Sequence, residues 1–145
     1  MKVLVQRVSE SRVTVAGEQI GAIGRGVLAL VGIECADDDA VVERMVRKLI
    51  GLRLFADDQG KMNLDLRDVS GAVLAVSQFT LAADTSRGRR PGFSRAAGPE
   101  EGLRLYQRFV ASLRQEGVTV ATGRFGADMQ VSLINDGPVT FMLEL

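Results

Sequence analysis

The chain contains no histidine, and this absence excludes more chemistry than any other feature of its composition. Histidine is the usual general base near neutral pH, a common metal ligand and the orienting partner in serine and cysteine triads. Zinc-protease helices and histidine-activated serine or cysteine catalysis are therefore excluded. Motifs for a serine nucleophile elbow, a phosphate loop, a dinucleotide loop and a Cys-x-x-Cys pair are absent as well. Any chemistry in this chain has to use other means.

Cysteine and long apolar stretches are also scarce. The single cysteine, Cys35, cannot form an internal disulfide, and its place at the end of the apolar run 27–33 predicts a buried structural thiol. No apolar stretch approaches the ~20 residues that a membrane helix needs. Segment 1–8 alternates like a strand and lacks the pattern of a secretion signal. We therefore expect a cytoplasmic protein with no membrane partner.

The net charge is zero, with 18 basic and 18 acidic residues, so the field of the whole protein does not attract nucleic acid. Local charge differs from this average. The segment between residues 85 and 99, called here the arginine loop, contains no acid and four arginines: Arg87, Arg89, Arg90 and Arg95. Arginine suits bidentate phosphate contact. The loop is therefore a candidate phosphate-binding segment, and a merely solvated loop is the alternative.

Length and periodicity predict one α/β domain spanning residues 1–145. Alternating apolar residues in 3–6 and 11–15 indicate two strands of an opening hairpin, and the unbroken apolar run 27–33 indicates a central strand buried on both faces. Further strand-like segments lie at 73–81, 118–122, 130–134 and 139–145. With two helices, these segments predict mixed β-sheets rather than a doubly wound dinucleotide fold.

Capping residues and apolar spacing predict the two helices. The aspartates at 37–39 supply N-cap oxygens to a helix that runs to about Leu52. Pro99 suits the first position of a second helix, which Gly117 ends. The apolar stripe expected on this second helix comprises Leu103, Tyr106, Val110 and Leu113.

Two short motifs carry the functional information. Residues 135–140 read Asn-Asp-Gly-Pro-Val-Thr, in which Pro138 has a fixed φ and Gly137 has no side chain to block approach. This peptide is well placed to present backbone carbonyls, although a hairpin turn between 129–134 and 139–145 is the plainer interpretation. The second motif, Ser-Gln-Phe-Thr-Leu at 77–81, closes the apolar run 72–76 with small donors and one aromatic residue.

Together these motifs resemble D-aminoacyl-tRNA deacylase, the editing enzyme that removes D-amino acids from tRNA. The resemblance covers residues 1–145 and extends to four other segments: Gln6-Arg7-Val8, Gly60-Lys61-Met62-Asn63-Leu64, Arg90-Pro91-Gly92-Phe93-Ser94 and Gly123-Arg124-Phe125-Gly126-Ala127-Asp128-Met129. At Gly92 a serine would fit the family pattern equally well, so the detail of that loop departs from the pattern.

The resemblance implies a fold and partners. The fold would be a three-layer α/β/β domain in which two strands are followed by two strand–helix units and then by three strands, written β2-(βα)2-β3. The protein would be a homodimer acting on the aminoacylated 3′ end of tRNA. Neither a cofactor nor a metal nor a DNA partner is expected. In the family the Gly137-Pro138 peptide would be cis and would reach into the partner subunit's active site. There its carbonyls would select the amino group of a D-residue and reject L-aminoacyl-tRNA, whereas glycyl-tRNA would pass this filter.

The resemblance also assigns roles to single residues. The catalytic segment would comprise Ser77, Gln78, Phe79 and Thr80. Adenosine and tRNA contacts would come from Phe125, Ala127, Met129, Arg87 and Arg90, with Gln6 and Arg7 bracing the Gly-Pro peptide. Structural alternatives remain open: Phe125 and Met129 would suit core or turn positions, Gln6 and Arg7 an ordinary strand pair, and Phe79 a core aromatic.

The ester of an aminoacyl-tRNA is activated, so positioning and oxyanion stabilisation could suffice for its hydrolysis. Thr80 lacks an obvious base to take its proton. We expect Phe79 and Thr80 to contribute amides or hydrogen bonds around the carbonyl, while a water assisted by the ribose hydroxyl attacks. Two other functions stay open: a non-catalytic binder of tRNA ends or single-stranded nucleic acid, and a threonine-nucleophile hydrolase of small esters.

Overall fold

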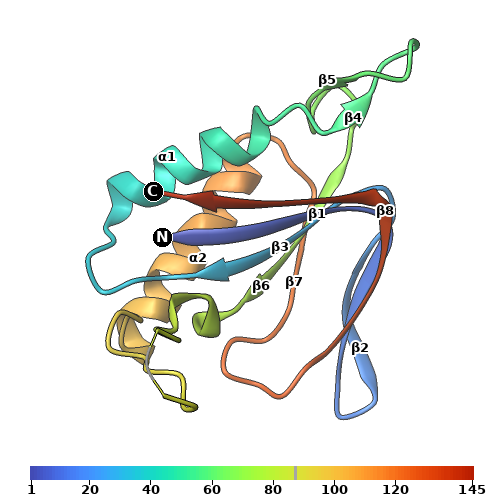
Figure 1. Cartoon of the computed structure of the whole chain (residues 1–145). Helices are drawn as coiled ribbons and strands as arrows, with labels where there is room; N and C mark the ends of the chain where they lie inside the picture. Colours follow the sequence, from blue (N-terminus) through green and yellow to red (C-terminus); the bar gives the residue numbers. More distant parts are fainter. Residues whose placement is uncertain (87) are drawn as a thin grey trace.

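The sheet is built around one long strand, β1 (Lys2–Val15), in the computed structural model, which describes residues 1–86 and 88–145. The first half of β1 pairs with β3 (Gly26–Gly32) and its second half with β2 (Glu18–Ile23), both antiparallel. Along the opposite edge of β1 runs β8 (Gln130–Glu144), also antiparallel. Figure 1 shows β1 and β8 lying together through their length.

Parallel strands extend the sheet beyond β3. Strand β6 (Ala72–Ser77) pairs with β3, and β7 (Val120–Thr122) pairs with β6, which gives the order β2-β1-β3-β6-β7 with β8 beside β1. A small hairpin of β4 (Phe55–Ala56) and β5 (Met62–Leu64) projects from one end of the molecule (Figure 1). The sheet is therefore mixed, as the sequence predicts.

Two helices cover one face of this sheet (Figure 1). Helix α1 (Asp39–Ile50) begins after Asp38, whose Oδ1 accepts a hydrogen bond from the Val41 amide at 2.9 Å. Helix α2 (Pro99–Gln115) has its proline in the first turn and is followed by Gly117 at φ +80°. Both predicted helices are confirmed. The buried face of α2 also includes Leu105 and Phe109, which the expected stripe omitted, whereas Leu103 is only half-buried.

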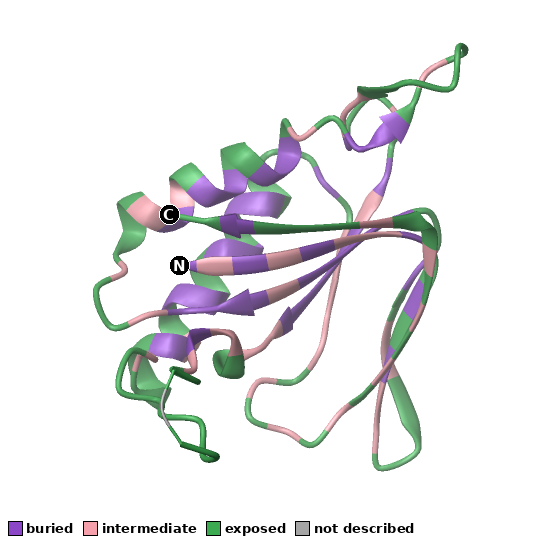
Figure 2. Cartoon of the chain, viewed as in Figure 1, coloured by how far each residue is buried: buried purple, intermediate pink, exposed green. Residues whose placement is uncertain are grey.

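Two apolar layers flank the central strands, and Figure 2 shows the buried residues concentrated there. Val27, Ala29 and Val31 of β3 face the helices, while Leu28 faces the other way. The second layer packs β3 and β6 against the far half of the sheet, and its buried members are Val8, Val13, Ile23, Leu28, Leu74 and Val76. Strand β3 is thus buried on both faces, and the predicted three-layer α/β/β class is confirmed.

The expected opening hairpin of 3–6 and 11–15 is wrong. Both segments belong to the single strand β1, and the hairpin partner is β2, reached through Ala16 and Gly17 at positive φ. The register shifts around Val8 let β1 bend without ending, because a bulge redirects a strand while pairing continues on either side. The polar residues between segments 3–6 and 11–15 have the composition of a turn, but they lie inside β1.

The expectation of a buried thiol at Cys35 is also wrong. Strand β3 ends at Gly32, and Cys35 lies exposed on the connection to α1, where its amide donates to the Arg95 carbonyl at 2.9 Å. The apolar run ends with Ile33, which is buried, and the chain then leaves the sheet. Burial of the run therefore does not extend to the residues that follow it.

Candidate active site

The Ser77–Leu81 motif occupies the turn at the end of β6. Ser77 is the last residue of β6, and a short 3-10 helix, η1 (Phe79–Ala82), follows directly. The Gln78 amide donates to the Val31 carbonyl at 2.7 Å, which fixes the start of the turn on β3. Gly32 permits this close packing, because a Cβ there would lie 2.9 Å from the Leu81 Cβ and 3.1 Å from the Gln78 carbonyl oxygen.

The turn exposes its polar atoms. Phe79 is 56% exposed and Thr80 is exposed, while Ser77 and Gln78 are half-buried. The Gln78 side-chain amide donates to the Thr80 hydroxyl oxygen. The first hydrogen bond of η1 runs from the Leu81 amide to the Gln78 carbonyl at 3.2 Å, so the amides of Phe79 and Thr80 precede it and have no acceptor within η1. The turn therefore offers two main-chain amides as hydrogen-bond donors, and the Thr80 hydroxyl, which accepts a hydrogen bond from the Gln78 side chain.

The Gly137-Pro138 peptide lies in a wide bulge of β8 and is not a hairpin turn. Both halves of β8 pair with β1, with Asn135 opposite Val8 and Thr140 opposite Gln6. Four residues, 136–139, therefore lie opposite Arg7 alone. The peptide bond is cis, and both Gly137 and Pro138 are exposed. The alternative interpretation, in which 129–134 and 139–145 fold back on each other, is wrong.

The side chain of Arg7, on the neighbouring strand β1, braces this bulge. Its Nε donates to the Asp136 carbonyl at 2.9 Å and lies 3.4 Å from the Asp136 carboxylate, while its Nη1 donates to the Leu54 carbonyl at 2.6 Å. The Arg7 side chain is only 13% exposed, so this is not an ordinary solvated strand residue. Gly137 leaves room for it, because a Cβ there would lie 3.0 Å from Arg7 Nη2. The guanidinium thus ties the bulge to the start of the β4–β5 hairpin.

A second set of contacts closes the bulge from within. The Val139 amide donates to Asn135 Oδ1 at 3.0 Å, and Asn135 Nδ2 donates to the Thr140 hydroxyl at 2.8 Å. Gln6 Nε2 donates to the same hydroxyl at 3.4 Å. Sequence reasoning gave a bracing role to Gln6 but none to Asn135 and Thr140, although both belong to the 135–140 motif. The signal was present, since asparagine side chains commonly bond to the backbone a few residues on.

Within one chain, the bulge and the Ser77–Leu81 turn do not meet. Ser77 pairs with Val31, which pairs with Val3, whereas the bulge lies opposite Arg7, four residues along β1. Strand geometry puts these points about 13 Å apart along the strands and about 14 Å apart across three strand spacings. The separation is therefore about 20 Å.

The 123–129 loop lies beside the end of β6. The Gly123 amide donates to the Ala75 carbonyl at 3.1 Å, and a Cβ on Gly123 would lie 2.7 Å from Met129 Sδ. The ring of Phe125 lies 6.0 Å from that of Tyr106, at an interplanar angle of 41°. Phe125, Ala127 and Met129 are all half-buried. Phe125 packs against the helix-side layer and Met129 against the second layer, so these residues are partly accessible and partly engaged in packing.

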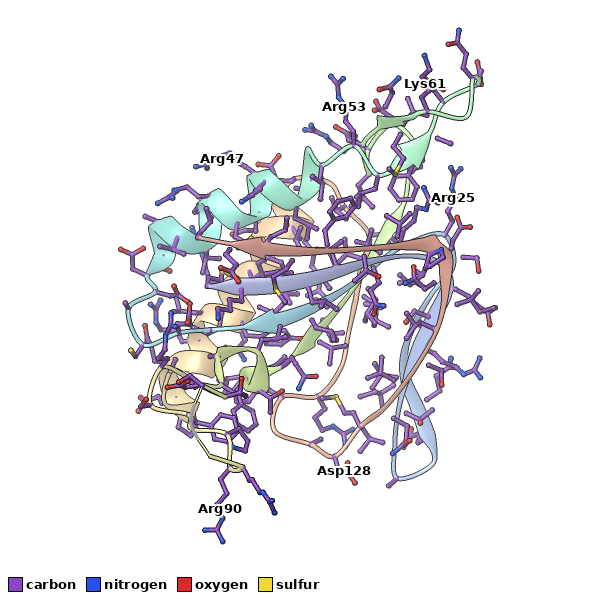
Figure 3. All side chains as sticks on the ribbon, in the orientation of Figure 1. Arg25, Arg47, Arg53, Lys61, Arg90 and Asp128 are labelled. Atoms are coloured by element: carbon purple, nitrogen blue, oxygen red, sulfur yellow. The ribbon has the colours of Figure 1, made fainter. Side chains whose placement is uncertain are left out.

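The arginine loop extends from the other side of the turn. Arg89 and Arg90 are exposed, and Arg90 points outward from the tip of the loop (Figure 3). Arg95 differs, because its Nη2 lies 3.1 Å from Glu34 Oε1. Arg87 lies outside the described residues.

Asp57, in the turn between β4 and β5, has structural partners. The Asp57 carboxylate accepts hydrogen bonds from the Asn63 side chain and from the amides of Lys61 and Gln59, and these bonds hold its pKa below the usual value. Among residues 1–86 and 88–145, no group of three or more Cys, Asp or Glu is placed to hold a metal ion. In the same residues, no helix has both the length and the apolar character to span a membrane.

Comparison with known proteins identifies the family. A sequence model described as D-Tyr-tRNA(Tyr) deacylase matches residues 4–144. The D-aminoacyl-tRNA deacylase of Alcanivorax borkumensis is 61% identical over 100% of both chains, and that of Alteromonas mediterranea is 59% identical over 95% of both. The chain belongs to the D-aminoacyl-tRNA deacylase family. The resemblance inferred from the two motifs is confirmed, and this deacylase family member is an enzyme that hydrolyses ester bonds.

Solved structures agree with this assignment of the deacylase fold. A structure titled "c-Myc DNA Unwinding Element Binding Protein" is 44% identical, with a TM-score of 0.95 and coverage of 100% of this chain and 99% of that one. A structure titled as a probable eukaryotic D-amino acid tRNA deacylase has a TM-score of 0.87 at 19% identity, over 99% and 98% of the chains. The second likeness supports the fold alone.

Proposed function

We propose that this chain hydrolyses the ester between a D-amino acid and the terminal ribose of tRNA, and so removes wrongly charged residues before translation. The observation that carries the proposal is the exposed Ser77–Leu81 turn, which presents a hydroxyl and two main-chain amides that have no acceptor within η1, in a chain of this family. Charged tRNA is used in the cytoplasm, so a cytoplasmic location follows from the same proposal.

The turn suits positioning better than nucleophilic attack. Among described residues, the hydrogen-bond partner of the Thr80 hydroxyl is the Gln78 amide, which is a donor and cannot take a proton. The Phe79 and Thr80 amides can instead stabilise the oxyanion that forms as the ester carbonyl is attacked. Water is the attacking group, and the adjacent ribose hydroxyl helps to move its proton. Ser77 and Gln78 hold the ester in place.

A second copy of the chain supplies the chiral filter in this proposal. The bulge at Gly137 and Pro138 is exposed, braced by Arg7 and about 20 Å from the turn of its own chain. In a homodimer, the carbonyls of this bulge can enter the other protomer's site and accept hydrogen bonds from the substrate ammonium group. A D-residue then directs its side chain away, whereas an L-side chain collides with the bulge. Glycine has no side chain, so glycyl-tRNA passes this filter.

The tRNA end is held by two further segments. In this proposal the terminal adenine binds at the 123–129 loop beside the end of β6, where the half-buried Phe125, Ala127 and Met129 offer apolar contact. Arg90, which is exposed, is available for contact with phosphates, and the same role is proposed for Arg87 from the sequence alone.

The test compares release of amino acid from D-tyrosyl-tRNA, L-tyrosyl-tRNA and glycyl-tRNA, with a chelator present throughout. We expect rapid release of D-tyrosine and glycine and little release of L-tyrosine. Equal release of both tyrosine enantiomers contradicts the filter, and loss of activity with the chelator contradicts metal-free hydrolysis. Sedimentation measures the dimer, and a monomer that retains full discrimination contradicts the cross-subunit filter.

Thr80→Ala separates positioning from nucleophilic attack. We expect this variant to retain part of its activity and to form no acyl-enzyme, because the main-chain amides remain. Near-total loss of activity, with a covalent acyl-enzyme trapped in the wild-type protein, would instead support a threonine nucleophile that acts on small esters.

Nucleic-acid binding without catalysis is the second candidate function. The 44% identical structure carries the name of a DNA-element binding protein, and the arginine loop provides exposed cations. This function predicts that single-stranded DNA binds as tightly as the tRNA end, with no release of amino acid from either enantiomer. The expectation of no DNA partner is tested by the same binding measurement.

A further inference from the structure

Two phenylalanines, Phe79 in the Ser77–Leu81 turn and Phe93 in the arginine loop, form an exposed pair. Phe79 is 56% exposed and Phe93 is 39% exposed, although phenylalanine is usually buried. Their ring centroids lie 5.0 Å apart with an interplanar angle of 55°. Neither ring belongs to the two apolar layers of the fold. The pair therefore presents aromatic surface to solvent rather than completing a core.

The backbone around Phe93 is anchored on both sides. Asp84 and Gly92 exchange two backbone hydrogen bonds, of 2.7 and 2.8 Å, directly before Phe93. Three residues after it, Ala96 pairs with Glu34, and the Ala97 amide donates to the Ile33 carbonyl at 3.0 Å. The ring is thus exposed on a segment that backbone hydrogen bonds anchor on both sides, which lowers the entropy lost when a ligand stacks on it.

The charge around the pair favours a polyanion. Arg89 and Arg90 are exposed in the segment that joins Gly92 to Asp84. Of the neighbouring acids, Glu34 is paired with Arg95, and the Asp84 carboxylate, which accepts a hydrogen bond from the Ser86 amide at 2.9 Å, offsets the charge of only one of these two arginines. Bases stack on aromatic rings irrespective of sequence, and nearby cations bind the backbone. The combination fits single-stranded nucleic acid better than it fits an apolar protein surface.

We propose that Phe93, together with Phe79, stacks the unpaired bases that precede the terminal adenosine of the tRNA. This inference rests on the proposed function, because the position of Phe79 in the turn places the pair beside the ester. The terminal adenine goes to the 123–129 loop on the other side of the turn. The pair is therefore left for the next bases, whose phosphates come within reach of Arg89 and Arg90.

The test uses Phe93 variants on two substrates, of which only the longer one carries these bases. The long substrate is D-tyrosyl-tRNA, and the short substrate is D-tyrosyl-adenosine. Phe93→Leu should lower kcat/KM for the tRNA about 5- to 150-fold, the range expected for one stacked base, mainly through KM. The same variant should leave kcat/KM for D-tyrosyl-adenosine unchanged, and Phe93→Trp should restore the tRNA value.

Met62→Ala is the matched control. Met62 is an exposed apolar residue on β5, next to Lys61 and at the opposite end of the molecule from Arg90 (Figure 3). The Met62→Ala variant should leave kcat/KM unchanged for both substrates. Three results would overturn the inference: equal loss on the two substrates, no loss on either, or a change of oligomeric state in RNA-free Phe93→Leu, which would make the pair a protein contact.

A binding measurement keeps the inference separate from the proposed function. The trinucleotide CCA should bind the wild-type protein more tightly than adenosine alone, and Phe93→Leu should abolish that difference. If the wild-type protein releases no amino acid yet shows this difference, the proposed function fails and the stacking site stands. If it releases D-tyrosine but binds CCA no better than adenosine, the stacking site fails and the function stands.

Discussion

Alkaline pH should destabilise this protein through one buried phenol, that of Tyr106. The side chain is 5% exposed in α2, and its hydroxyl donates to the Ala75 carbonyl at 2.9 Å. Burial disfavours the phenolate and raises the pKa of Tyr106 from 10.0 to about 12, while the positive charge of Arg114 opposes this shift. The neutral phenol is therefore the form that the fold selects.

The magnitude follows from the difference between the folded and unfolded pKa values. A raised folded pKa means that the stabilisation is fully present below pH 10.0 and is lost as the pH rises through about 12. A difference of about two pKa units corresponds to about 3 kcal/mol of the free energy of unfolding. The loss arises because the unfolded chain releases its phenolic proton first.

The assay is direct because Tyr106 is the only tyrosine and the chain has no tryptophan. Ultraviolet absorbance of the tyrosinate in the folded protein should titrate near pH 12, and urea unfolding should show the declining stability. Tyr106→Phe should cost about 1 kcal/mol at neutral pH for the lost hydrogen bond, and it should lack this part of the alkaline decline. The two proteins differ only at residue 106, so other contributions to the alkaline decline cancel in the comparison. A folded-state titration near pH 10, or the same decline in Tyr106→Phe, refutes the reasoning.

Three further substitutions test the bulge and the fold. Gly137→Ala should cost about 1–3 kcal/mol in urea unfolding, because φ is +133° and the new Cβ would lie 2.7 Å from Val139 Cγ2; unchanged stability would contradict the geometry of the bulge. Arg7→Gln should cost about 2 kcal/mol by removing charged hydrogen bonds to the bulge and to Leu54, and it should slow release of D-tyrosine; full activity would show that the brace is dispensable. Asp38→Ala should cost about 1 kcal/mol by removing the N-cap of α1 without changing kcat/KM; reduced activity in the folded variant would link α1 to the site.

Much of the fold could be predicted from local sequence. The helix boundaries follow from Asp38, Pro99 and Gly117, whose effects operate within one turn of chain. The unbroken apolar run 27–33 marks a strand buried on both faces, because alternate side chains point to opposite sides of a sheet. These features need no knowledge of what lies across the sheet.

Two of the errors share one physical cause, which is that strand pairing joins residues far apart in the sequence. Strand β1 continues through a polar stretch because β8 supports it on both sides of the bulge near Val8. The segment around Pro138 has good turn chemistry, yet both of its flanks pair with β1 instead of each other. Cys35 follows a buried run but leaves the sheet. Local composition does not distinguish these outcomes.

The sequence by itself determined the family, the two functional motifs and the absence of histidine chemistry, because each is a property of residue identity and order. Only the tertiary structure decided how those motifs are arranged. It presents Gly137 and Pro138 on a braced, exposed bulge, places them about 20 Å from the Ser77–Leu81 turn of the same chain, and exposes the Phe79 and Phe93 pair beside that turn. Register, bulges and exposure arise from contacts between distant segments, so they emerge only when the chain has folded.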